Sequence, residues 1–467
     1  MVYSSHQFGD DTQRSSSGGH VSIPDPAAIE RSAIRKVSWR LVPFVALMFF
    51  INFLDRTAIS FAGPNGMSKD LGLTAAQFGL AAGVFFIGYI LLEIPSNLAL
   101  HKFGARRWLA RIMVTWGIVA LLFTWVSSLS GLYILRFLLG VAEAGFFPGA
   151  ILFLSTWVPA KHRSHILALF YLAQPLTIVI GAPVAALLID AHGLFGLAGW
   201  RIMFFGVAIP AILIGVVAWF YLTDKPSQAN WLTAAERDWL TAKLEAEEHE
   251  KGGKGAPALH GNPLAALTNG RVWAFALMYF GLIYGLYALA FFLPAIIGGF
   301  ETRFGTHFNV FQKGLITAIP YLPAALALYL WSRDATRRGV RSWHLSVPAL
   351  IGAVSVPLAL QMGSPAASIA IITLTACAIF SALPNFWALP ARFLSGAAAA
   401  AGIALINTVG NVAGFVAPYL TGIGKDVSGS YQLPMLIVGA MMLMSAVLAL
   451  TVGRTSPEAS LAPVEAH

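Results

Sequence analysis

Twelve long apolar segments, separated by shorter polar ones, form the dominant pattern of this chain. Each segment has about 18 residues or more, enough at about 1.5 Å per residue for a helix to cross most of a hydrocarbon core of about 30 Å. Strands of a membrane barrel would instead alternate apolar and polar side chains, so the pattern predicts helices. The predicted spans cover roughly residues 37 to 63, 75 to 100, 108 to 127, 132 to 157, 165 to 189, 200 to 222, 272 to 299, 312 to 331, 343 to 362, 367 to 390, 394 to 423 and 432 to 453.

Polar stretches divide the spans into two groups of six. Residues 1–36 begin with a Ser- and Gly-rich stretch without the layout of a signal peptide, and we predict that they form a disordered cytoplasmic tail. Residues 37–222 hold the first six spans, and residues 271–453 hold the other six. Between them, residues 223–270 form a central cytoplasmic loop, and residues 454–467 form a second cytoplasmic tail.

The central loop contains one further predicted helix. Thr233 followed by Glu236 has the spacing of a capping box, which typically opens a helix. One face of this helix is apolar, formed by Trp239, Leu240 and Leu244. We expect it to run to about Glu250, where a Gly-rich stretch follows, and to serve as scaffold.

Composition and charge agree with a membrane protein that crosses the bilayer many times. The chain is 57% hydrophobic and 11% charged, whereas soluble domains average about 25% charged residues. The net charge of +9 could suggest a nucleic-acid partner, but most Lys and Arg residues fall on one side of the predicted spans. This distribution predicts cytoplasmic termini and no nucleic-acid partner. The single cysteine, Cys377, excludes a disulfide within the chain.

Four charged residues lie deep within two of the predicted spans, where an ion costs several kcal/mol unless it is paired or faces a wet cavity. Asp55 and Arg56 are in the first span, and Arg136 and Glu143 are in the fourth. Because Arg136 and Glu143 are seven residues apart, they project from nearly one helix face, about 10.5 Å apart along the axis. If the two spans face each other, the four groups can form one network. Such a network is either a static lock between helices or a proton site, because a carboxyl group in a low dielectric holds its proton more tightly than in water.

Asp55 and Arg56 cannot serve one surface, because adjacent helical residues point about 100° apart. We assign Asp55 to the network with the fourth span, together with Arg136 and Glu143 as proton-coupling residues. We assign Arg56 to a central cavity, where its planar guanidinium suits a carboxylate partner.

The second half offers no Asp, Glu, Lys or Arg deep in its predicted spans, so it can supply only hydrogen bonds and aromatic surface. Its candidate binding residues are Tyr284, Tyr287, Trp387, Asn407 and Asn411, of which Tyr284 is chosen from its placement alone. Glu93, near the inner end of the second span, is predicted to fix helix packing.

Several strings in the first half resemble those of a known transporter family. They are Phe53-Leu54-Asp55-Arg56, Glu93-Ile94-Pro95-Ser96-Asn97, Gly104-Ala105-Arg106-Arg107-Trp108, Arg136 through Glu143-Ala144-Gly145-Phe146 with Pro148-Gly149, and Asp224-Lys225-Pro226 followed by Trp231-Leu232. Together with the layout of six plus six spans, they resemble the anion:cation symporters of the major facilitator superfamily, most closely the tartrate, phthalate and hydroxyphenylacetate permeases. The basic loop after the second span departs from the superfamily pattern by having His101 where an acid is common.

The resemblance implies an all-α membrane protein with 12 transmembrane helices in two six-helix halves. In that family, the positions matching Asp55 and Glu143 carry the coupled proton, and the position matching Arg56 holds the substrate carboxylate. The positions matching Tyr89, Gln174, Trp387 and Asn407 would line the substrate cavity beside Arg56. We also expect Gln174 to favour a hydroxylated substrate, since some aromatic-acid permeases have an apolar residue there.

These observations predict a proton-coupled symporter that imports a small organic anion, such as tartrate, a sugar acid or an aromatic acid, by alternating access. It would be a monomer in the lipid bilayer of an inner membrane, with protons and the organic anion as partners and without a cofactor or metal. One alternative is an efflux antiporter, although residues 180–186 lack the fuller Gly-rich pattern of antiporters. A second alternative is a membrane enzyme or sensor. Intramembrane catalysis needs groups such as histidine, and none of the histidines lies at mid-membrane in the predicted spans.

Overall fold

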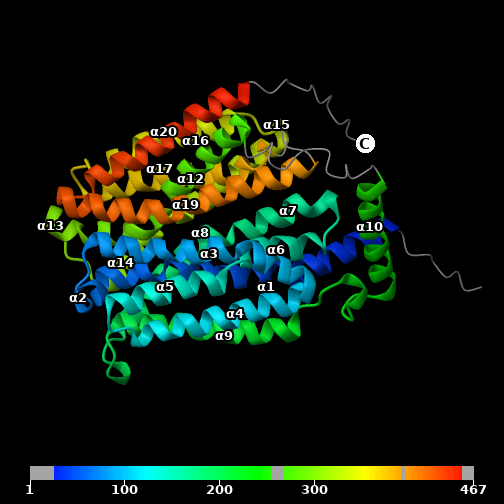
Figure 1. The fold of residues 1–467 in the computed structure, drawn as a ribbon, viewed down its shortest axis with the longest axis horizontal. Coiled ribbons are helices and arrows are strands. Elements are labelled where there is room, and N and C mark those ends of the chain that lie inside the picture. The colour runs from blue at the N-terminus through cyan, green and yellow to red at the C-terminus, as the bar shows by residue number, and fades with distance from the viewer. Residues whose placement is uncertain (1–25, 254–267, 391–395, 455–467) are drawn as a thin grey trace, which may run out of the picture.

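The computed structural model describes residues 26–253, 268–390 and 396–454, which form helices and connecting turns without a strand. Figure 1 shows the long helices running side by side in two layers, the first half of the chain below and the second half above. The first layer comprises α1 (Pro26–Ala62), η1 (Gly63–Met67), α2 (Ser68–Asp70), α3 (Ala75–Phe103), α4 (Ala105–Leu122), η2 (Phe123–Trp125), α5 (Leu129–Glu143), α6 (Phe146–Ser155), α7 (Ala160–Tyr171), α8 (Ala173–Asp190), η3 (Leu194–Gly196) and α9 (Gly199–Tyr221). The second comprises α12 (Gly270–Gly298), α13 (Phe300–Phe304), α14 (Val310–Ala318), α15 (Tyr321–Arg338), α16 (Trp343–Ala359), α17 (Pro365–Phe386), α19 (Gly396–Ser428) and α20 (Gln432–Arg454).

The helices confirm the predicted fold class. Within the described ranges, 11 segments are long and apolar enough to cross a membrane, and the shorter apolar helix α16 supplies the remaining predicted span. Several spans are broken into two helices, as between α5 and α6, where Gly145 has a left-handed backbone with φ of 83°. Because this conformation strains any residue with a Cβ atom, glycine is required at the break.

The first helix is longer than predicted. It begins at Pro26, so residues 26–36 are helical and not part of a disordered tail. The rest of that predicted tail, the end of the central loop and the C-terminal tail lie outside the described residues.

The predicted helix of the central loop is confirmed as α10 (Ala234–Gly253), which stands across one end of the bundle in Figure 1. The capping box is present: the Thr233 amide donates to Glu236, and the Glu236 amide donates to Thr233 Oγ1. Glu236 also accepts hydrogen bonds of 2.7 Å from Lys36 Nζ and Ser32 Oγ of α1. Burial favours the protonated acid, but these bonds outweigh it and lower the pKa of Glu236 to about 2. The Glu236 carboxylate therefore holds α10 against α1 of the first half.

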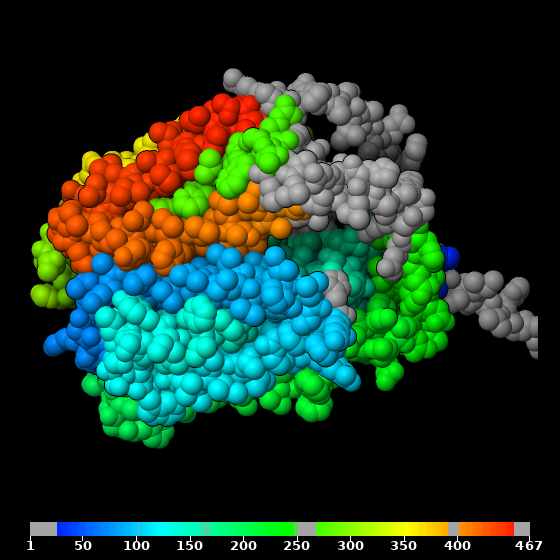
Figure 2. Space-filling view, viewed as in Figure 1, coloured from blue at the N-terminus to red at the C-terminus, as the bar shows by residue number. Residues whose placement is uncertain are grey.

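The two halves pack closely at the end of the bundle that holds the start of α3 and the end of α19. These two helices lie side by side along the border between the halves (Figure 2). Asp426 of α19 accepts hydrogen bonds from the backbone amides of Ala75 (3.0 Å) and Ala76 (2.7 Å), at the start of α3. Helices α8 and α14 form a second contact between the halves at this end. A Cβ atom added at Gly314 of α14 would lie 2.8 Å from the Ala182 carbonyl oxygen of α8. Small residues thus allow the backbones of the two halves to approach at this end.

Candidate functional site

A buried ion pair between α1 and α5 forms the centre of the candidate site. Arg56 is 8% exposed and Glu143, the last residue of α5, is fully buried. Arg56 Nε donates to Glu143 Oε1 at 2.9 Å, and Arg56 Nη2 donates to the same oxygen. An arginine that directs two N–H groups at one carboxylate oxygen makes a charge-assisted contact of the stronger kind. Burial of both ions is offset in part by this pairing.

The second half of the chain reaches the same guanidinium. Arg56 Nη1 donates to the hydroxyl oxygen of Tyr287, which lies on α12, at 3.0 Å. The rings of Phe85 and Tyr89 on α3 lie 5.0 and 5.2 Å from the guanidinium carbon, within range for cation–π attraction. Arg56 on α1 therefore contacts three other helices, α3 and α5 of the first half and α12 of the second.

Asp55 points away from this pair, to a different helix. Its Oδ2 accepts a hydrogen bond of 2.6 Å from the indole Nε1 of Trp116 in α4. The predicted division of Asp55 and Arg56 between two surfaces is found, and Asp55 lies within electrostatic range of Glu143 and Arg136 without bonding to either. The sequence assigned the network with the fourth span to Asp55, whereas Arg56 makes the direct contact with Glu143. The 100° separation is a local property of a helix, but the neighbour that each face meets is set by packing.

Arg136 contacts backbone oxygens. Its Nε donates to the Ala81 carbonyl at 3.0 Å and its Nη2 to the Ala82 carbonyl at 3.1 Å, both on α3. Among the described residues, Arg136 makes no hydrogen bond or ion pair with an acid. Glu143, Arg56 and Asp55 nevertheless lie within electrostatic range of its guanidinium.

One oxygen of the central acid remains without a partner. Asn52 lies beside Glu143, one turn before Arg56. In the described ranges, neither the Asn52 amide nor Glu143 Oε2 makes a hydrogen bond of ordinary geometry, although both are buried. Buried polar atoms are rarely left without a hydrogen bond, so these atoms of Asn52 and Glu143 require a functional explanation.

Glu93, which is predicted to fix helix packing, joins α3 to a helix of the second half. Its Oε1 accepts a hydrogen bond of 2.9 Å from Asn407 Nδ2, and its Oε2 accepts one of 3.3 Å from Asn411 Nδ2. Glu93 lies on α3 and both asparagines lie on α19, so this cluster also joins the halves. Arg56 is within electrostatic range of the Glu93 carboxylate. The available signal was an acid within an apolar run, which is as unusual for Glu93 as for Glu143.

The other predicted binding residues have different surroundings. Gln174 is half-buried at the second position of α8, directly after the break that separates α7 from α8. Trp387 follows the end of α17 and packs on Tyr279, with ring centroids 4.9 Å apart. Of the two candidate tyrosines on α12, Tyr287 contacts Arg56, whereas Tyr284 is buried against Phe280.

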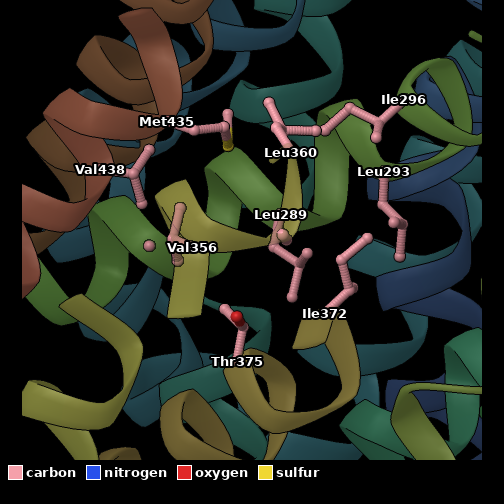
Figure 3. Close-up of a pocket in the computed structure, with 11 residues that line it drawn as sticks. Leu289, Leu293, Ile296, Val356, Leu360, Ile372, Thr375, Met435 and Val438 are labelled. Carbon is pink, nitrogen blue, oxygen red and sulfur yellow. The ribbon is translucent and has the colours of Figure 1, made fainter. Parts of the chain in front are cut away.

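A cavity in the second half lies apart from these charged groups. It holds about 400 Å³ of empty space between α12, α16, α17 and α20, and Figure 3 shows its lining side chains. The lining is apolar apart from Thr375, whose hydroxyl is engaged by Ser355 at 2.8 Å. Nothing in this lining could bind a carboxylate.

A second, small cavity lies between the halves at their closely packed end. Phe61, Asn65, Ala186, Gly314 and Thr317 are among its lining residues.

The basic loop after the second span has an acidic partner despite His101. Asp224, which follows α9, accepts a hydrogen bond of 2.8 Å from the backbone amide of Arg106, and its other oxygen lies 3.8 Å from Arg106 Nε. The superfamily pattern places an acid in this loop. In this chain the acid that contacts the loop is Asp224, from the end of the sixth span.

Comparisons with known proteins agree on the type of molecule. Residues 45–418 match the description "Major Facilitator Superfamily". A protein named "Putative tartrate transporter" from Agrobacterium vitis is 46% identical over 431 residues, covering 92% of this chain and 93% of its own length. A "Quinolone resistance transporter" from Acinetobacter baumannii is 38% identical, covering 90% of this chain and 94% of its own.

Among solved structures, a bacterial homologue of the human lysosomal transporter Spinster, in an inward-facing and unoccupied conformation, has a TM-score of 0.69 at 17% identity. The match covers 90% of this chain and 97% of that one. At this identity the match concerns the fold alone.

Proposed function

Because the chain belongs to the major facilitator superfamily, a family of membrane transporters and not of enzymes, we propose that it is a proton-coupled symporter that imports a small organic anion. The observation that carries this proposal is the buried Arg56, which is bonded to an acid of its own half and to Tyr287 of the other half. The relative named as a tartrate transporter supports a carboxylate as the substrate.

Arg56 has the chemistry to hold that carboxylate. A guanidinium stays charged and can donate two parallel hydrogen bonds to a carboxylate. In this structure Glu143 takes two of its N–H groups. If Glu143 becomes neutral by binding a proton, its hold on Arg56 weakens and the guanidinium can turn to a substrate carboxylate. Proton and anion then bind together, which is the requirement for symport.

The proton has two candidate carriers in this arrangement. Glu143 Oε2 is buried and makes no hydrogen bond of ordinary geometry in the described ranges, so it can take a proton while Oε1 stays with Arg56. Asp55 is 2% exposed and held by a single indole N–H. Both acids lie in the first half, whereas the acids in the described spans of the second half, Asp334 and Asp426, lie near helix ends.

Substitution of the two acids tests this assignment. In proteoliposomes with an imposed pH gradient, Asp55→Asn and Glu143→Gln should each abolish accumulation of tartrate against its gradient while some exchange of tartrate remains. Glu301→Gln, which changes an acid in the loop helix α13, is the matched control and should accumulate tartrate as the wild type does. If uptake by Asp55→Asn and Glu143→Gln keeps the pH dependence of the wild type, the proton assignment is wrong.

Efflux by antiport is the second candidate, since one relative is named as a quinolone resistance transporter. The two functions differ in the direction in which the organic substrate moves under a defined pH gradient. A gradient that is acidic outside should drive tartrate into vesicles holding a symporter, whereas an antiporter would expel its substrate.

The orientation follows from charge. We propose that both termini are cytoplasmic, because the basic loops lie on the side of the termini. We also propose that the chain is a monomer of a bacterial inner membrane. Under this orientation the closely packed end of the bundle faces outward, and α10 lies on the cytoplasmic face.

A further inference from the structure

Asn52 is a fully buried amide on α1 that makes no hydrogen bond of ordinary geometry in the part of the chain that the structure describes. It lies one turn before Arg56, so the two side chains project from nearly the same face of the helix. Arg56 contacts Glu143 from this face, and Asn52 lies beside the same acid. One side of α1 therefore presents both a guanidinium and an amide to Glu143.

The two carboxyl oxygens of Glu143 have different surroundings. Arg56 donates to Oε1 through Nε and Nη2, whereas Oε2 is buried and unbonded within the described ranges. Glu143 is also the last residue of α5, where the helix dipole disfavours a negative charge. An ionised Oε2 therefore needs a hydrogen-bond donor, and a protonated Oε2 needs an acceptor for its O–H group.

The Asn52 carboxamide can meet both needs, because it carries an N–H donor and a C=O acceptor on one group. The last torsion of an asparagine side chain is broad and roughly two-fold, so a half-turn exchanges the two atoms without moving the backbone. By contrast, the Trp116 indole that holds Asp55 can only donate. Residues 51–62 of α1 and Glu143 are all buried, so bulk water cannot take the place of the amide in this conformation.

We propose that Asn52 positions the coupled proton on Glu143. When Glu143 is ionised, Asn52 Nδ2 donates to Oε2. When a proton binds Oε2, the carboxyl group becomes neutral and its new O–H donates to Asn52 Oδ1, while no other group gains or loses a proton. On the premise of the proposed proton coupling, Asn52 is thus a positioning residue that acts through Glu143.

Other charged or titratable groups also act on the Glu143 carboxyl. Among the described residues they are Asp55 and Arg56 on α1, Arg136 on α5, Tyr89 on α3 and Tyr287 on α12. All of them are kept when Asn52 is replaced by an apolar residue. A change in proton binding by Glu143 can then be assigned to the amide.

Infrared difference spectroscopy on the purified full chain in lipid measures proton binding by Glu143 without any substrate. A protonated carboxyl group has a C=O band distinct from that of a carboxylate, and the Glu143 band is the one that Glu143→Gln removes. Asn52→Leu keeps a similar size but removes both hydrogen-bonding atoms. The pH at which the Glu143 band is half developed should rise by about one unit, because a hydrogen bond to the ionised acid is stronger than one to the neutral acid. The band should also move to higher wavenumber, because its O–H group loses an acceptor.

Ser60→Ala is the matched control, because Ser60 is another buried polar residue of α1 but its hydroxyl donates to the Thr57 carbonyl of the same helix. Its midpoint should equal that of the wild type. Asn52→Gln keeps the amide and should leave the midpoint closer to the wild type than Asn52→Leu does. Melting temperatures identify any variant that fails to fold, and the smaller Asn52→Ala replaces Asn52→Leu in that case.

Three results separate the possible failures. A midpoint and a band position in Asn52→Leu equal to those of the wild type would overturn the role of Asn52 and leave the proposed function standing. An equal shift in Ser60→Ala would overturn that role as well, because the effect would then belong to the helix and not to the amide. A wild-type Glu143 band that does not change between about pH 4 and about pH 10 would remove Glu143 as a proton carrier, and with it both the role of Asn52 and this part of the proposed function.

Discussion

Replacing Gly314 by alanine should shift the protein away from the conformation seen here, because this glycine sets the approach of the two halves. A Cβ atom at Gly314 would lie 2.7 Å from Ala186 Cβ and 2.8 Å from the Ala182 carbonyl oxygen, both on α8. Ordinary contacts of this kind begin at 3.4 Å, so α14 and α8 would have to part by 0.6 to 0.7 Å, the difference between those distances. The obstacle on one side is backbone, which cannot rotate away.

The cost of such overpacking is about 1 to 3 kcal/mol. It falls only on the conformation in which α8 and α14 are in contact. In alternating access this end of the bundle opens, and the clash between the added methyl group and α8 is then removed. The ratio of open to closed molecules should rise by a factor of about 5 to 150, the equivalent of that free energy. The helix-forming advantage of alanine over glycine is present in both conformations and cancels.

Thiol labelling measures this ratio. Thr317 lines the cavity between the halves and is 2% exposed, so Thr317→Cys in a Cys377→Ala background reports opening of that cavity. A membrane-impermeant maleimide, added outside, should label the Gly314→Ala protein faster by the factor above.

Gly298→Ala is the matched control, because Gly298 lines the same cavity but a Cβ there has nothing within 4 Å. It should label as the parent protein does. Equal labelling rates for Gly314→Ala and Gly298→Ala, with both proteins folded, would refute the view that α8 and α14 separate during the transport cycle.

Two further predictions follow from single side chains. Arg56→Lys keeps the charge but loses the planar guanidinium that now reaches Glu143 and Tyr287. The dissociation constant of tartrate, measured by calorimetry, should therefore rise about tenfold or more. An unchanged affinity would show that Arg56 does not hold the carboxylate. The pKa of Glu236 is lowered from 4.5 to about 2, so its contribution to the attachment of α10 is complete above about pH 4.5 and is lost as the pH falls towards 2. The protection factors of the α10 amides, which correct for the pH dependence of intrinsic exchange, should therefore fall over that range in the wild type. In Glu236→Gln they should be low already at neutral pH and vary little. Equal protection factors of the wild-type helix at pH 6 and pH 3 would contradict this.

The sequence alone determined the properties that depend on neighbouring residues. Hydrophobic runs gave the spans because a helix must be long and apolar enough to remain in lipid whatever it packs against. The capping box at Thr233 and Glu236 was predictable because its hydrogen bonds join residues three apart. The burial of Asp55, Arg56, Arg136 and Glu143 followed from their positions within those runs.

Only the tertiary structure decided which of these groups meet. Helix periodicity separates Asp55 from Arg56, but packing turns Arg56 to Glu143 and Asp55 to Trp116. Glu93 meets Asn407 and Asn411 across more than 300 positions of sequence, which no local pattern encodes. The physical reason is that the rotation of each helix about its axis is fixed by close contacts with several neighbours, and these contacts come from distant parts of the chain.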